Sequence, residues 1–374
     1  MRQKIGDRRW FDVEVASLLA LKDRSMSQEA KETHAQPFAW GRLLLRVVLL
    51  AIGGISLYLF LPRLLEVFEQ APRLENIQWR WFFLMAALMT GAFVALWELT
   101  RIAVPGISWF VASTSQLTSN AAVKLTPGGI VAGGAFYFRM LAASGIPMTH
   151  AAAALASVGV LSNLVLFALP AVALIIAAIS APIPQGMLPV AIAGTILFIV
   201  MFTATVALVR FDRPLHLLGK MVESMVSWSA RRFNREWSFT EAGLVESRDL
   251  VVAALGKRWQ LALAVATLNW LLDYATLVVA LFAIGANPRP SLILLAFAGA
   301  AVLGMIPLTP GGLGFVEAGL VGMLTISGIP ASDALLATLA YRMFQFWLPI
   351  PAGLVAYFVF RSRYGKLSEL PEMA

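Results

Sequence analysis

The sequence predicts an all-α polytopic membrane protein with six full crossings and two Pro-Gly-Gly broken hairpins in an inverted repeat. Three observations predict this fold. The 374 residues are 59% hydrophobic and only 13% charged, whereas a soluble domain has about a quarter of its residues charged. The apolar residues form runs of about 20 residues or more, the length that crosses a hydrocarbon core of about 30 Å. One segment that contains Thr-Pro-Gly-Gly occurs twice.

The predicted transmembrane domain covers residues 40–362, between an N-terminal extension, 1–39, and a tail, 363–374. Six apolar runs are long enough for full crossings: 41–61, 79–103, 148–179, 186–210, 258–285 and 331–360. Two further apolar stretches, 107–146 and 290–329, are interrupted by Pro-Gly-Gly. Each of these two stretches has room for two half-helices or for two short crossings, so the chain returns to the side from which it came.

Positive charge predicts the orientation. The polar loop 211–257 and the residues that flank it contain nine Lys and Arg residues, and the tail and its flank add three more: Arg210, Arg213, Lys220, Arg231, Arg232, Arg235, Arg248, Lys257 and Arg258, then Arg361, Arg363 and Lys366. The opposite side has few. The positive-inside rule therefore places both termini and this loop in the cytoplasm, in a multi-pass protein of the cell membrane. Residues 1–39 have no apolar core, so we expect a cytoplasmic extension and no signal peptide.

Inside the loop, apolar residues recur at helical spacing after Pro214. This pattern predicts a helix, either lying on the cytoplasmic face of the membrane or simply connecting two crossings.

The repeat is the strongest signal in the sequence. Thr-Pro-Gly-Gly begins at Thr126 and at Thr309, and Ser-Gly-Ile-Pro begins at Ser144 and at Ser327; both pairs are 183 positions apart. Aligning 125–156 with 308–339 gives 14 identities in 32 positions.

Each predicted copy is a helix, a broken hairpin and a helix. Repeat A covers 79–179 and repeat B covers 258–361. A single crossing separates them, which would invert the second copy relative to the first, as in many transporters.

Each Pro-Gly-Gly breaks a helix, because proline lacks an N–H and paired glycines let the chain reverse direction. The backbone groups that are freed cannot face lipid, so they face protein or a wet cavity. A single copy would suggest only a tight loop at the membrane surface, but two copies at one offset favour a functional cavity. The substrate-binding residues expected from the breaks are Thr126, Gly128, Gly129, Thr309, Gly311 and Gly312.

Polar and charged residues inside apolar segments usually mark function, because they are expensive in lipid. The expected substrate-binding residues of this kind are Lys124, Arg139, Asn163, Asp273, Glu317 and Arg342. Such a mixture suits an anionic or zwitterionic phospholipid headgroup, with arginine gripping phosphate. It would equally suit a structural charge network, in which Lys124 snorkels to the surface and Asp273 pairs with an arginine. Glu98 and Arg101 are expected to form an interfacial pair.

Composition also argues against other classes. The net charge of +8 is concentrated at the ends of apolar runs, where topology and lipid headgroups explain it, so we expect no nucleic-acid partner. The chain has no cysteine, and its three histidines are far apart. We therefore expect no metal, no cofactor and no catalytic residue. The oligomeric state stays open, a homo-oligomer included.

The chain resembles the lysylphosphatidylglycerol synthase/flippase transmembrane family over roughly residues 40–362. The resemblance is carried by Pro-Gly-Gly-Leu-Gly at 310–314 followed by Glu317, and by Tyr341-Arg342 leading into Trp-Leu-Pro at 347–349; Arg139 in the first copy also fits. It implies a lipid-handling membrane domain, with Glu317 and Arg342 along a translocation path. Members that synthesise lysylphosphatidylglycerol carry a further soluble domain after the membrane part. Because this chain ends soon after its last crossing, we expect no aminoacyl transfer.

The resulting hypothesis is a lipid transporter or flippase that moves a phospholipid or lipid-linked headgroup through a polar cavity between the inverted repeats. Two alternatives stay open. One is an integral membrane enzyme acting on a lipid, which the lack of a nucleophile or metal motif disfavours. The other is a non-catalytic membrane partner of a lipid-synthesis enzyme.

Overall fold

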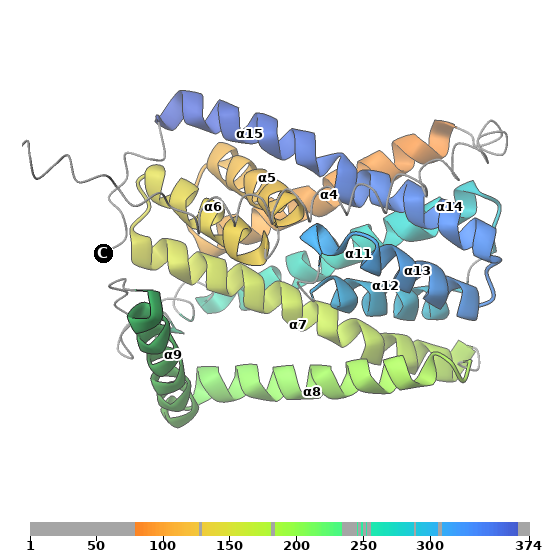
Figure 1. Cartoon of the computed structure of the whole chain (residues 1–374), viewed down its shortest axis with the longest axis horizontal. Coiled ribbons are helices and arrows are strands. Elements are labelled where there is room, and N and C mark those ends of the chain that lie inside the picture. Colours follow the sequence, from red (N-terminus) through yellow and green to blue (C-terminus); the bar gives the residue numbers. More distant parts are fainter. Residues whose placement is uncertain are drawn as a thin grey trace, which may run out of the picture. The chain divides into compact units, whose positions relative to one another are not determined.

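The computed structural model describes most of the chain from Trp79 onward, within one compact unit, Ile52–Ala374. The described residues are 79–126, 129–180, 184–233, 245, 248–249, 252, 256–287, 289–305 and 309–365. The predicted extension 1–39, the predicted crossing 41–61 and Gly128 lie outside them. The regular elements in the described part are all helical, which confirms the predicted all-α class (Figure 1).

Five helical segments of the described part are long and apolar enough to cross a membrane, and they coincide with five of the six predicted crossings. They are α4 (Trp79–Ala103), α7 (Met148–Ser180), α8 (Leu188–Arg210), α11 (Trp259–Ala283) and the segment Ala331–Tyr364. A short 3₁₀ turn, η1 (Gly256–Arg258), precedes α11.

The helix predicted inside the polar loop is confirmed as α9 (Asp212–Phe233), which directly follows α8 (Figure 1). Leu217 and Met221 are exposed on it, four positions apart, and Lys220 is exposed beside them. Arg248, later in the loop, pairs with Asp212 at the start of α9, and this hydrogen bond lowers the pKa of the Asp212 carboxyl. This ion pair therefore holds the later part of the loop, at Arg248, against the start of α9.

The two stretches interrupted by Pro-Gly-Gly are hairpins of short helices. The first contains α5 (Trp109–Leu125) and α6 (Gly129–Ala143), and the second contains α12 (Pro290–Gly304) and α13 (Phe315–Ile326). The two helices of each hairpin pack against each other. These helices have 17, 15, 15 and 12 residues, fewer than the roughly 20 that span a bilayer core.

The order of elements repeats along the chain. The 183-residue offset lays α4 on α11, α5 on α12 and α6 on α13. Packing follows the same correspondence: α5 packs against α15 (Pro349–Tyr364) of the second copy, and α12 packs against α7 of the first. The two copies also meet along α4 and α11. The inverted orientation of the copies stays a prediction.

The outer surface of α8 is apolar, as a helix that contacts lipid requires. Only Ala191 is buried on this helix, whereas large apolar side chains such as Ile192, Ile196 and Ile199 are about half exposed. An apolar surface of this extent would drive aggregation in water. In the membrane it contacts lipid tails, while α12, with nine buried residues between Ser291 and Ala300, occupies the protein interior.

Small residues bring the helices close together. A Cβ atom on Gly353 in α15 would overlap the backbone of Leu117 in α5, and Thr118 donates a hydrogen bond to the Gly353 carbonyl at 3.3 Å. A Cβ atom on Gly194 in α8 would lie 2.6 Å from the ring of Pro170 in α7. Close backbone approach through glycine is the usual way in which helices associate in membranes, where the hydrophobic effect does not drive them together.

The last crossing changes its helical form in the middle. α14 (Ala331–Arg342) ends at Arg342, a π-helical turn η3 (Met343–Trp347) follows, and α15 begins at Pro349. The Leu348 N–H bonds the Met343 carbonyl at 2.9 Å, five residues back, as a π turn requires. The cause is Pro349, which has no N–H to continue the α-helical ladder.

Candidate functional site

A cavity of about 260 Å³, into which several polar side chains converge, lies where the two hairpins meet the long helices. Helices of both repeats line it: α5, α6 and α7 of the first, and α11, α12, α13 and α14 of the second, with the turns η2 (Pro310–Gly312) and η3. Its polar lining comprises Asn120, Lys124, Asn163, Asp273, Arg342 and Gln345. Buried polar groups are expensive in a membrane protein, so their convergence on one cavity marks it as the candidate site.

The second Pro-Gly-Gly break forms one wall of this cavity. Gly311 in the 3₁₀ turn η2 (Pro310–Gly312) has φ +57°, a conformation that glycine adopts readily. A Cβ atom there would overlap the ring of Phe346 and would lie 3.2 Å from the Lys124 Cα. Lys124 lies at the end of α5, three residues before Pro127. This short distance therefore shows that the end of α5 contacts the second break.

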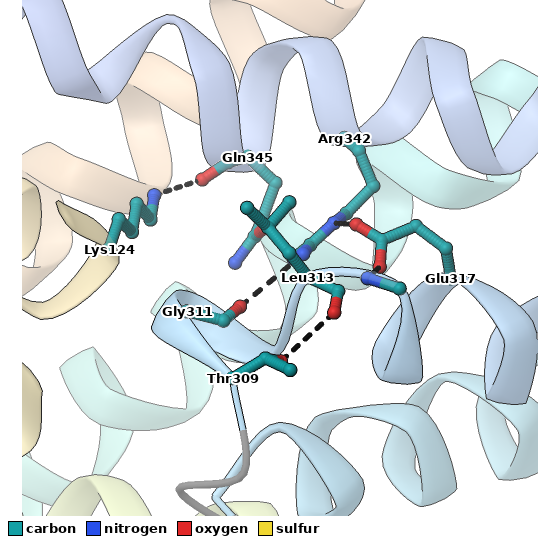
Figure 2. Close-up of polar contacts among 8 residues, drawn as sticks. Lys124, Thr309, Gly311, Leu313, Glu317, Arg342 and Gln345 are labelled. Carbon is teal, nitrogen blue, oxygen red and sulfur yellow. Dashed lines mark hydrogen bonds and ion pairs between the residues drawn. The ribbon is translucent and has the colours of Figure 1, made fainter. Parts of the chain in front are cut away.

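Arg342 is buried and is held from three sides (Figure 2). Its Nε donates to Glu317 Oε1 at 2.7 Å, its Nη1 to Gln345 Oε1 at 3.0 Å and its Nη2 to the Gly311 carbonyl at 3.4 Å. The guanidinium carbon also lies 4.5 Å from the centre of the Phe346 ring. A guanidinium has five N–H groups, so two are not used by these three contacts.

Glu317 is fully engaged in holding this arrangement. Its second oxygen, Oε2, accepts the Gly314 N–H at 2.7 Å at the start of α13, where an acidic residue in the first turn satisfies a free backbone donor. One carboxylate therefore links the first turn of α13 to Arg342 at the end of α14. Glu317 does not line the cavity, and both of its carboxylate oxygens are used by these two contacts.

Lys124 is buried, and its ammonium lies 5.4 Å from the centre of the same Phe346 ring. Its ammonium donates to the backbone carbonyl of Gln345 (Figure 2). That carbonyl is the one that would bond residue 349 in an α-helix, and Pro349 cannot donate. The ammonium has three N–H groups, so two are free to bind a ligand.

Asp273 is the acidic group of the cavity. It lies on α11 and accepts the hydroxyl of Tyr341 at 2.9 Å. The described residues provide no cation within 4.0 Å of its carboxylate, although pairing with an arginine was one alternative from the sequence. Asn269, one turn earlier, instead donates to the Ala92 carbonyl of α4 at 2.8 Å and ties the two copies together.

Comparisons with known proteins identify the family of the chain. The family model described as "Lysylphosphatidylglycerol synthase TM region" matches residues 35–353. The chain belongs to this family. Three matches to UPF0104 membrane proteins of Methanothermobacter thermautotrophicus have 30% identity over 87 residues, 32% over 89 and 27% over 88. Each covers 23–24% of this chain and about a quarter of the relative's length. No solved structure matches the chain.

This member of the lysylphosphatidylglycerol synthase transmembrane family is thus a multi-pass integral membrane protein of a family named for lipid metabolism. Of the residues predicted for its site, Lys124, Asn163, Asp273, Gly311 and Arg342 line the cavity together. Glu317 lies directly behind Arg342.

The other predicted site residues have local roles or lie elsewhere. Thr126 bonds the Ala122 carbonyl, Thr309 bonds the Leu313 carbonyl and Gly129 packs against the backbone of Val123. Gly312, with φ +72°, packs against Val316. Arg139 is exposed on α6 and does not line the cavity of this family member, although it had been expected deep in the membrane. Its exposure leaves it outside the binding proposal below.

Some site residues were not in the predicted set. Asn120 lies one helical turn before Lys124 in α5, and this i, i+4 spacing could have identified it. The role of Gln345 depends on Pro349, which frees its carbonyl, and the Phe346 ring lies close to both the Lys124 and the Arg342 cation. The sequence signal for Gln345 was the proline four positions later. The predicted pair of Glu98 and Arg101 is confirmed, with an Oε2 to Nη1 distance of 2.7 Å.

Proposed function

We propose that this protein moves a phospholipid, or a lipid-linked headgroup, between the leaflets of the cell membrane. The observation that carries the proposal is the cavity at which both hairpin copies meet, since it buries Lys124 and Arg342 with N–H groups to spare. In the middle of an apolar protein these groups are costly unless a ligand or water uses them. A phosphate group offers the acceptors that they require.

In the proposed mechanism, the polar headgroup enters the cavity and its phosphate binds between Lys124 and Arg342. The acyl chains stay in the bilayer, because the outer helices present apolar surface to it. Rocking of the two hairpins would then open the cavity to each leaflet in turn, as in transporters built from inverted repeats. Both termini lie in the cytoplasm in this proposal, as the distribution of Lys and Arg indicates.

The proposed activity leaves the lipid chemically unchanged and uses no cofactor. Purified protein in vesicles should therefore exchange acyl-labelled phospholipid between leaflets without forming a new lipid species. A modified lipid detected by mass spectrometry would favour the alternative of a membrane enzyme.

Filling the cavity should block exchange. Ala301 in α12 lines it, and Ala301→Phe would place a ring in the space for the headgroup. We expect exchange of acyl-labelled phospholipid in reconstituted vesicles, with and without a proton gradient, to fall to the rate of protein-free vesicles. The matched control is Ala193→Phe on the exposed surface of α8, which should keep the wild-type rate. Equal rates for the two variants would contradict the proposed path.

A further inference from the structure

The cavity contains two charged groups, Lys124 and Asp273, that form no ion pair within 4.0 Å in the described part of the chain. Lys124 bonds only a backbone carbonyl, and Asp273 bonds only a hydroxyl. Arg342, in contrast, is already neutralised by Glu317. Burying an unpaired charge costs several kcal/mol. Two unpaired charges of opposite sign on one cavity therefore fit a ligand that brings one negative and one positive group.

Aromatic rings surround the acidic end of the cavity. Trp270 lies one turn before Asp273 on α11, and Phe297 lies between Trp270 and Tyr341, with ring centres 6.0 and 6.4 Å away. All three rings line the cavity. The Trp270 N–H donates to the Ser162 carbonyl at 2.8 Å, and the Tyr341 hydroxyl donates to Asp273. These two hydrogen bonds fix the orientation of both rings. Aromatic faces beside a carboxylate form the usual environment for an ammonium group.

An acceptor without a hydrogen-bond donor also favours an ammonium group. Asn120 lines the cavity, and its Oδ1 is buried and has no hydrogen-bond partner in the described part of the chain. A buried acceptor without a donor is unfavourable, because it has lost its hydrogen bonds to water and gained none in return. A primary ammonium group, which has N–H donors, would satisfy it, whereas a quaternary ammonium or a further anionic group would not.

We propose that the cavity recognises a zwitterionic phospholipid headgroup, with its ammonium group at Asp273 and the three aromatic rings and its phosphate between Lys124 and Arg342. This proposal rests on the proposed function, and it adds the class of lipid. A zwitterion matches the unpaired Lys124 and Asp273 and leaves no net charge in the cavity. An anionic headgroup without an amine would leave Asp273 unpaired beside a second negative charge.

The test compares three acyl-labelled lipids in vesicles that contain the purified full chain: phosphatidylethanolamine, phosphatidylcholine and phosphatidylglycerol. The first two share an ammonium beside a phosphate, and their relative rates distinguish a primary from a quaternary amine. We expect both zwitterions to exchange about tenfold faster than phosphatidylglycerol, the ratio that a single contact worth about 1.4 kcal/mol gives. Equal rates for all three lipids would overturn the assignment of lipid class while leaving the proposed function intact. No exchange above protein-free vesicles for any lipid would instead defeat the proposed function itself.

Asp273→Asn is the variant that tests the ammonium subsite. Asparagine has nearly the same shape and can still accept the Tyr341 hydroxyl, so only the charge is lost. We expect the two zwitterions to slow about tenfold and phosphatidylglycerol to keep its rate, which removes the selectivity. The matched control is Asp333→Asn, which changes an acid near the start of α14 that does not line the cavity. Equal slowing of all three lipids in Asp273→Asn would make Asp273 a structural residue and would overturn the subsite.

Discussion

Replacing Glu317 with glutamine is expected to lower the free energy of unfolding by about 3–5 kcal/mol, the usual cost of breaking a buried ion pair from one side. The side chains of Glu317 and Arg342 are both 5% exposed, so the variant leaves a buried guanidinium without its counter-charge. The amide also loses charge at the Gly314 N–H, which weakens the start of α13. We expect leaflet exchange to be lost as well, because Arg342 is no longer held at the cavity.

The chain provides a matched control for this prediction. Glu98 and Arg101 form an ion pair of the same 2.7 Å length, but their side chains are 36% and 33% exposed. Partly exposed pairs contribute about 0–1 kcal/mol, so Glu98→Gln should change stability little. Unfolding of detergent-solubilised protein, followed by tryptophan fluorescence, compares the two variants. Equal loss of stability in both would show that the Glu317–Arg342 pair has no special structural role.

Replacing Lys124 with methionine should abolish leaflet exchange without the loss of stability expected for Glu317→Gln. Methionine is similar in length and removes a buried ammonium whose desolvation costs several kcal/mol. The loss of the hydrogen bond to Gln345 would cost only about 1–3 kcal/mol. We therefore expect stability to be unchanged or higher. We expect leaflet exchange to be abolished, because Arg342 is neutralised by Glu317 and Lys124 is the remaining cation for the phosphate in the proposed site.

The control for this variant is Lys220→Met, which makes the same substitution at an exposed position of α9. It should keep both stability and the exchange rate. The same two measurements apply: unfolding in detergent and exchange of acyl-labelled lipid in vesicles. If Lys124→Met instead destabilises the protein as much as Glu317→Gln does, then Lys124 supports the helix break and does not serve a ligand.

Most of the fold could be predicted from the sequence because lipid imposes simple rules. A run of about 20 apolar residues must be a crossing, and its length alone located α4, α8 and α11. The two hairpins followed from Pro-Gly-Gly at one offset, since proline and glycine break helices wherever they occur together. The π turn η3 was not predicted, although Pro349 is its cause, because a proline alone does not say how the ladder before it will adjust.

The site was harder to predict because it depends on contacts between distant segments. The rule that a charge in an apolar run marks function selected Lys124, Asp273 and Arg342, which line the cavity. The same rule selected Arg139, which lies on an exposed part of α6, because the sequence does not say which side of a short helix faces inward. The rule also could not tell that Glu317 pairs with an arginine whereas Asp273 has no ion pair and lines the cavity. That difference arises from distant neighbours: Arg342 lies beside Glu317, and Tyr341 lies beside Asp273.

Water access to the cavity from both sides of the membrane tests the central claim most directly. The native chain has no cysteine, so a single Asn163→Cys variant reports only its own position in the cavity wall. A membrane-impermeant thiol reagent, applied in turn to right-side-out and inside-out vesicles, should label this cysteine from either side. Ile196→Cys, on the lipid-facing surface of α8, should react from neither. Labelling of Asn163→Cys from one side alone, or from neither, would contradict a cavity that carries a headgroup between the leaflets.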